Sequence, residues 1–376
     1  GDRRQETEVG RKLEGFADIC FRSEREEGNV RRLITACSLL ALVGCQGASD
    51  VSDDAPDTDV APAVAAGIRA DTLLAEVERL ASDAFEGRAP GSEGETRTIE
   101  YLREQFSALG LAPGNPDGTW VQNVPLVGIT PAAGDTLRIS RGDDTRTLEP
   151  GADYVAYTKR VVDRVEVDAE FVFVGYGAVA PEYDWNDFKD VDVTGKILLF
   201  LVNDPPSDGL FGGQAMTYYG RWTYKHEIAA EKGAAGSFVI HETGPAGYPW
   251  EVIGNNPHGE SFDLVTDDGN TGRAIVEGWI RHPAAVELFD LAGLDFDELK
   301  SRAAERSFQP VSLGVTGRTR IRNSRRTIDS KNFVARFPGS EAPDEIVMYV
   351  AHWDHLGRDE TLAEDQVFNG AADNAT

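Results

Sequence analysis

The chain has 376 residues and carries 37 Lys and Arg against 64 Asp and Glu, a formal net charge of -27 at pH 7. Because a nucleic-acid-binding surface needs an excess of basic side chains, this balance argues against DNA or RNA as a partner. The length allows two domains with their own cores. All three cysteines, Cys20, Cys37 and Cys45, lie near the start, so the remainder can hold neither a disulfide nor a cysteine-based zinc site.

The first recognisable element in chain order is a targeting signal. Arg31 and Arg32 precede an apolar run at 33–43, which is too short to cross a bilayer core of about 30 Å. The run closes at Cys45 in a pattern that resembles the bacterial lipoprotein box. We therefore interpret residues 30–45 as a lipoprotein signal peptide. Cys45 would be lipidated, and the protein would be anchored to the membrane of the bacterial cell envelope, on its periplasmic or extracytoplasmic side. A buried helix or strand with an incidental cysteine is the alternative.

The segments on either side of this signal have no pattern of a folded core. Residues 1–29 are charged and aperiodic and do not fit in front of a signal peptide, so we interpret them as an artefactual extension. Residues 46–66 are rich in Asp, Ala, Ser and Pro, which predicts a flexible acidic tether.

Residues 67–126 predict two helices joined by a loop, and we assign them to the first part of a core domain. The first helix should be capped by Asp71, and the second should run from about Glu93 to a stop at Gly110. Arg88 lies in the connecting loop. It could reach a substrate, but anchoring of the loop is the interpretation that we prefer.

Residues 127–325 form a β-rich inserted region, with a core at about 165–300. Strand-like runs at 165–174, 197–202 and 237–241, and a helical pattern at 223–232, predict a small domain of strands with one or two helices. The region also contains His226, His241, His258 and His282. Their irregular spacing indicates ordinary surface or core roles rather than a metal cluster.

Residues 326–376 return to a strand pattern. We expect one strand at 332–337 and a second at 346–351, paired as a hairpin or as neighbours. The second strand would end at His352.

The chemistry-bearing residues of this last segment are His352, Asp354 and Asp373. Alternate positions of a strand end point to the same side, so Asp354 can reach His352 and orient its ring. Asp373 follows in a glycine-rich turn. An imidazole and a carboxylate suit Zn²⁺, and a carboxylate can bridge two ions about 3.5–4 Å apart. Composition alone leaves a metal site and a solvated His–Asp pair equally open.

The runs Ala351–Gly357 and Asn369–Ala375 resemble the co-catalytic zinc aminopeptidase family, which includes bacterial leucyl aminopeptidases, aminopeptidase Y and glutamate carboxypeptidases. Residues 80–110 share the similarity, and 170–255 resemble the protease-associated domain that is inserted in such enzymes. The resemblance implies an α/β fold. A three-layer peptidase domain with a mixed central sheet, incomplete at the C-terminus, would be interrupted by the β-rich protease-associated domain.

The resemblance also implies residue roles. His352 would be a ligand of one zinc, Asp373 would bridge both zinc ions, and Asp354 would orient His352. His355 matches the motif but is not a ligand in the family, and a cis peptide often follows the bridging aspartate. The general base and the later ligands follow this aspartate in the family, so we expect residues 326–376 to be a truncated core and the chain to be an inactive N-terminal piece.

The function that the resemblance implies is an aminopeptidase, which releases N-terminal residues from peptide substrates through a water activated by two Zn²⁺ ions. Two alternatives come from other classes. One is a non-catalytic, lipid-anchored protein that binds peptides through its protease-associated domain. The other is a metallohydrolase that acts on phosphate or amide bonds.

Overall fold

The computed structural model describes residues 69–376, apart from 190, 207–208, 214–215 and 361. The chain divides into Gly1–Gly67 and Ile68–Thr376, and all the described residues belong to the second unit. The proposed signal peptide, Cys45 and the tether lie outside the described residues. In the part of the chain that is described, no helix combines the length and the apolar run needed to cross a bilayer.

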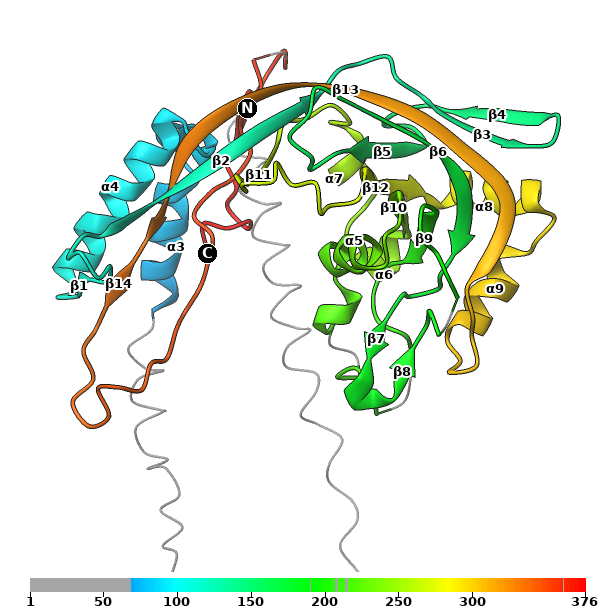
Figure 1. Cartoon of the computed structure of the whole chain (residues 1–376). Helices are drawn as coiled ribbons and strands as arrows, with labels where there is room; N and C mark the ends of the chain where they lie inside the picture. Colours follow the sequence, from blue (N-terminus) through cyan, green and yellow to red (C-terminus); the bar gives the residue numbers. More distant parts are fainter. Residues whose placement is uncertain (1–68, 190, 207–208, 214–215, 361) are drawn as a thin grey trace, which may run out of the picture. The chain divides into compact units, whose positions relative to one another are not determined.

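The main element is a mixed sheet of ten strands (Figure 1). Eight strands follow one path across it: β11 (Ser261–Leu264), β2 (Val121–Pro131), β13 (Val311–Phe333), β6 (Arg164–Phe173), β9 (Ile197–Leu201), β10 (Gly236–His241), β12 (Val276–Arg281) and β5 (Tyr154–Tyr157). β3 (Leu137–Arg141) and β4 (Asp144–Leu148) branch from β13. The pairs β6–β9, β9–β10 and β10–β12 are parallel and the others are antiparallel. The predicted α/β class with a mixed sheet is therefore confirmed.

The remaining described elements are helices and short ladders. The helices are α3 (Ala70–Leu80), η2 (Asp83–Arg88), α4 (Glu93–Ala108), η3 (Pro181–Tyr183), η4 (Tyr218–Gly220), α5 (Trp222–Glu231), α6 (Thr243–Ala246), α7 (Glu251–Gly254), α8 (His282–Ala292) and α9 (Phe296–Ala303). The paired two-residue strands are β1 (Ala112–Pro113) with β14 (Ala335–Arg336), β7 (Val179–Ala180) with β8 (Trp185–Asn186), and β15 (Gly357–Arg358) with β16 (Val367–Phe368).

Helices cover both faces of the parallel part of the sheet. Successive side chains of a strand point to opposite faces, so Phe238 and Ile240 of β10 join one apolar cluster and Val239 joins another. The first cluster includes Leu288 of α8, and the second includes Ile228 of α5. This two-sided burial explains the continuous apolar runs that predicted β9 and β10.

The predicted helices are present, with one correction to a cap. α3 begins after Arg69, not after Asp71, and Arg69 has extended backbone angles typical of an N-cap. Asp71 lies inside the first turn, where its carboxylate accepts from the Thr72 N–H and the Arg69 side chain. α4 begins as expected, because the Ser92 hydroxyl accepts from the Glu95 N–H.

The longest strand, β13, was not predicted as one element. It pairs with β2 over 323–333 and with β6 over 311–322, so it crosses the expected boundary between residues 325 and 326. Leu313, Val315 and Ile321 are buried on one side, while arginines alternate with them and pair with acidic residues of neighbouring segments. The domain boundaries themselves stay a prediction.

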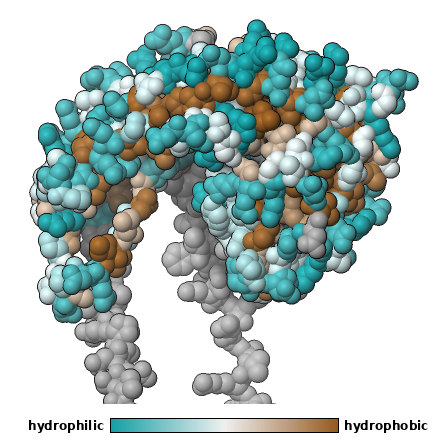
Figure 2. All heavy atoms as spheres, viewed as in Figure 1, coloured by the Kyte–Doolittle hydropathy of each residue, from teal (hydrophilic) through white to brown (hydrophobic). Residues whose placement is uncertain are grey.

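The predicted strand at 346–351 is wrong. The five residues from Ile346 to Val350 have no strand assignment, and each is between 77% and 94% exposed. A strand needs a neighbour to satisfy its peptide groups, and no described segment pairs with this one. Hydrophobic side chains are therefore left on the surface, and Figure 2 shows such a patch at the lower left, near the chain that follows β14.

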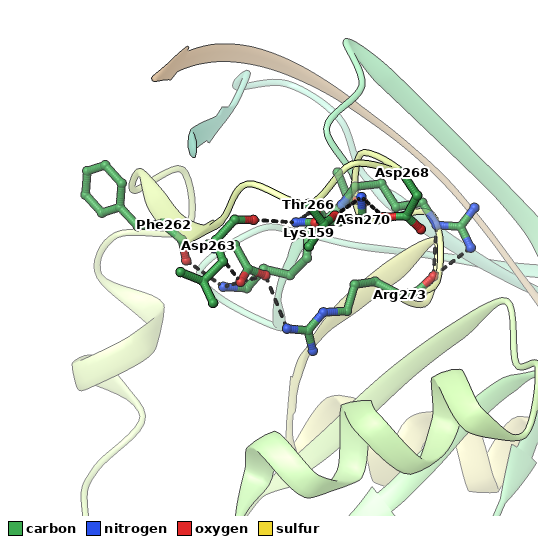
Figure 3. Close-up of polar contacts among 10 residues, drawn as sticks. Lys159, Phe262, Asp263, Thr266, Asp268, Asn270 and Arg273 are labelled. Atoms are coloured by element: carbon green, nitrogen blue, oxygen red, sulfur yellow. Dashed lines mark hydrogen bonds and ion pairs between the residues drawn. The ribbon is translucent and has the colours of Figure 1, made fainter. Parts of the chain in front are cut away.

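A polar network joins the turn after β11 to the chain that follows β5 (Figure 3). Lys159 donates to the Phe262 carbonyl at 2.9 Å and lies 3.8 Å from the Asp263 carboxylate, which Arg273 approaches at 3.4 Å. The Asn270 amide donates to the Lys159 carbonyl at 3.1 Å. These contacts fix a long irregular segment against the sheet.

Beside this network lies a buried carboxyl. Glu277 of β12 is 2% exposed. Burial raises the pKa of Glu277 to about 7, and the charges of Arg273 and Lys159 act in the opposite direction, while Asp263 and Glu227 add to the rise.

We predict that Glu277→Gln changes the pH dependence of stability. The folded pKa of about 7 exceeds the ordinary 4.5, so Glu277 contributes a stability that is complete below pH 4.5 and lost as the pH rises through 7. The wild type should therefore lose roughly 1–3 kcal/mol of unfolding free energy relative to Glu277→Gln between pH 4.5 and pH 8. Urea unfolding of both proteins at both pH values measures this. If the difference in unfolding free energy between wild type and variant is the same at both pH values, the prediction is contradicted.

Candidate metal centre

The three candidate residues near the C-terminus lie on two loops that a short ladder joins. β15 follows the loop that carries His352 and Asp354, and β16 precedes the turn that carries Asp373. β15 and β16 pair antiparallel, with Gly357 opposite Phe368. The pairing brings the two loops together even though Ile346–Val350 form no strand.

The structure places His352 and Asp373 in direct contact. The Nε2 atom of His352 lies 3.0 Å from Oδ1 of Asp373. The other ring nitrogen, Nδ1, lies 3.0 Å from the main-chain oxygen of Asp354 and 3.4 Å from its carboxylate. A carbonyl oxygen only accepts, so Nδ1 is the donor towards Asp354, and Nε2, on the side of Asp373, is the nitrogen that a metal ion would bind.

This arrangement fits a zinc ion. Two donors that hold one Zn²⁺ at tetrahedral angles stand about 3.3 Å apart, close to the separation found here. The His352 and Asp373 side chains are 51% and 76% exposed, so an ion can reach both. Zinc needs three or four protein donors, and the described residues contain no cluster of three His, Cys, Asp or Glu side chains suited to a metal.

Other features of the two loops agree with the sequence motifs. The Asp373–Asn374 peptide bond is cis, as the resemblance implies. His355 is partly buried, and burial lowers its pKa, with Arg88 and His352 acting in the same direction and Asp373 and Asp354 against it. The role of Asp354 stays a prediction, since its main-chain oxygen is closer to the imidazole than its carboxylate is.

A loop from the N-terminal helices supports both metal-site loops. Gly87 of η2 lies so close to the ladder that a Cβ atom would overlap the Gly357 oxygen and come within 2.7 Å of the Phe368 oxygen. The Asn369 amide donates to the Ala81 carbonyl and to the Asp83 carboxylate. The sequence drew attention to this loop, but not to its contact with residues far along the chain.

Residues 332–376 match peptidase family M28. Over this segment the chain is similar to that family. The match contains His352, Asp354 and Asp373, so it confirms the resemblance to zinc peptidases in the part of the chain where the geometry has just been described.

Solved structures give a broader but weaker likeness. An aminopeptidase from Aneurinibacillus sp. strain AM-1 is 18% identical, with a TM-score of 0.37, over 82% of this chain and 56% of that one. BSAP, a zinc aminopeptidase from Bacillus subtilis, is 14% identical with a TM-score of 0.30, over 82% of this chain and 54% of that one. The chain thus spans just over half the length of these proteins. No curated protein sequence matches it.

Two histidines of the inserted region, outside the M28 segment, lie in packing environments. His226 is buried, and its Nδ1 lies 2.6 Å from the Ser237 hydroxyl. His241 packs against the rings of Trp250 and Trp279.

We predict that Gly87→Ala opens the β15–β16 ladder. The new methyl group would force the Gly357 and Phe368 carbonyls away and destabilise the closed ladder. A destabilisation of about 1.4 kcal/mol raises the population of the open ladder tenfold, so trypsin cleavage after Arg358 should accelerate roughly tenfold. Gly110→Ala is the matched control, because Gly110 also has a positive φ but has open space around its missing Cβ. Equal cleavage rates in the two variants would contradict the close approach.

Proposed function

We propose that the whole protein is a zinc-dependent metallopeptidase, specifically an aminopeptidase that uses two zinc ions to release N-terminal residues from peptides. The observation that carries the proposal is the contact between His352 Nε2 and Asp373 Oδ1 at 3.0 Å inside the M28 segment. The motif resemblance at 351–357 and 369–375 supports the finer assignment to aminopeptidases.

The residues of this chain would hold and orient the ions. His352 offers one nitrogen, whose direction is set by the bond from its other nitrogen to Asp354. Asp373 has two carboxylate oxygens, which allow it to contact two ions. When bound, zinc supplies polarisation of the scissile carbonyl and lowers the pKa of a water. The proposal requires further ligands and a general base beyond those that the described residues bring together.

The proposed site of action is the bacterial cell envelope. The order of two arginines, an apolar run and Cys45 supports a lipid anchor at that cysteine. Peptides that reach the outer side of a membrane would then be the substrates.

We predict that the whole protein binds zinc through His352 and Asp373. Replacing either residue, in His352→Gln or Asp373→Asn, should weaken zinc binding at least tenfold, because each change removes one donor. His282→Gln, at the start of α8, is the control and should bind like the wild type. Calorimetric titration measures the affinities.

The double variant decides whether the two residues hold one ion. If they do, His352→Gln with Asp373→Asn should lose little more affinity than either single change, since their effects are coupled. Independent, additive losses would contradict a shared ion.

The activity is tested on the whole protein with leucine p-nitroanilide. Release of p-nitroaniline should stop in the presence of a chelator, return when zinc is added, and fall to background in Asp373→Asn. Peptide binding without hydrolysis would favour the peptide-binding alternative. Metal-dependent cleavage of phosphate esters but not of the anilide would favour a different hydrolase.

A further inference from the structure

Arg88 is the most deeply buried arginine of the described residues, and it holds backbone from three parts of the chain. It is 1% exposed and has a φ of +52°. Its guanidinium donates to four carbonyl oxygens: those of Leu80 at 2.6 Å, Trp353 at 2.9 Å, Asn369 at 2.8 Å and Gly370 at 2.8 Å. In addition, the main-chain oxygen of Arg88 accepts from the His355 N–H at 3.2 Å.

These carbonyls belong to the two loops that carry the candidate ligands. Trp353 stands between His352 and Asp354, while Asn369 and Gly370 open the turn that leads to Asp373. One planar group therefore fixes the backbone on both sides of the contact between His352 and Asp373. A lysine could not replace it, because an ammonium lacks the rigid fork of a guanidinium.

Other contacts also hold the two loops, among them the bond from the Asn374 amide to the His352 carbonyl at 3.3 Å, but none of them reaches both loops and η2 through one side chain. β15 and β16 contribute only two residues each, and a ladder this short is marginal. The apolar segment Ile346–Val350, which leads into His352, forms no strand. The loops thus depend on contacts from η2.

The positive charge of Arg88 also interacts with two acids of the candidate metal centre. Burial lowers the pKa of Arg88, and attraction to Asp354 and Asp373 offsets part of this effect. The guanidinium is therefore within electrostatic reach of both acids.

We propose that Arg88 is a positioning residue, which sets the distance between the His352 loop and the Asp373 turn before any metal binds. The role in metal binding rests on the proposed function. The role in loop order does not, because it follows from contacts present without metal.

The test compares Arg88→Lys with Arg97→Lys. Arg97 is a matched control, because it donates to the Ala84 carbonyl of the same loop but is 42% exposed and bonds to neither metal-site loop. In metal-free protein, amide hydrogen exchange of 352–356 and 369–375 should rise at least tenfold in Arg88→Lys and stay unchanged in Arg97→Lys. The strand peptide 236–241 serves as the internal reference for the remainder of the fold.

Zinc titration gives the second readout. Loss of a partner that orients metal ligands typically costs 10- to 100-fold in affinity, so Arg88→Lys should fall in this range while Arg97→Lys stays within about twofold. Unchanged exchange of both loops in Arg88→Lys would overturn the proposal. Looser loops together with no zinc binding by the whole wild-type protein would keep the positioning role and reject the proposed function.

A global loss of structure is distinguishable as well. If 236–241 also exchanges faster in Arg88→Lys, Arg88→Ala is titrated with methylguanidinium, which can occupy the vacated space. Recovery of protection in both loops supports the positioning role, and failure to recover in either loop overturns it.

Discussion

The bonds from the Arg88 guanidinium to four carbonyl oxygens are the interaction on which the candidate metal centre depends. Hydrogen bonds that involve a charged group contribute roughly 1.5–3 kcal/mol each, and here they link α3, the His352 loop and the Asp373 turn. Without them, the two loops would be joined by a two-residue ladder and a few single hydrogen bonds, such as the one from Asn374 to the His352 carbonyl. In the proposed account, the 3.0 Å contact between His352 and Asp373 depends on a side chain far away in sequence.

A second buried cation is used in the same way in the inserted region. Lys225 of α5 is 0% exposed, and its ammonium donates to the carbonyls of Tyr176, Asn203 and Tyr219. Burial lowers the pKa of Lys225 to about 7, while Asp187 and Asp204 act against this shift. In both places, backbone carbonyls and more distant acids compensate the buried positive charge. The same hydrogen bonds hold irregular segments that are not part of a sheet.

The sequence predicted the elements whose pattern is set by burial within a short window. β9 and β10 are apolar on both faces, and α4 has a serine cap, so local rules suffice for them. Ile346–Val350 carries an equally clear strand pattern, but strand formation depends on a partner that local sequence does not contain. For the site, the motif identified His352 and Asp373, whereas the four contacts of Arg88 join residues up to 282 positions apart and leave no local signal.

The most direct test of the account is the crystal structure of the zinc-loaded whole protein, with the ion located by anomalous scattering at the zinc edge. We expect one zinc bound to both His352 Nε2 and the Asp373 carboxylate, with bonds of about 2.0–2.2 Å, while Arg88 keeps its bonds to the Trp353 and Gly370 carbonyls. A zinc that binds only one of the two side chains, or a site that forms with Arg88 detached, would contradict it.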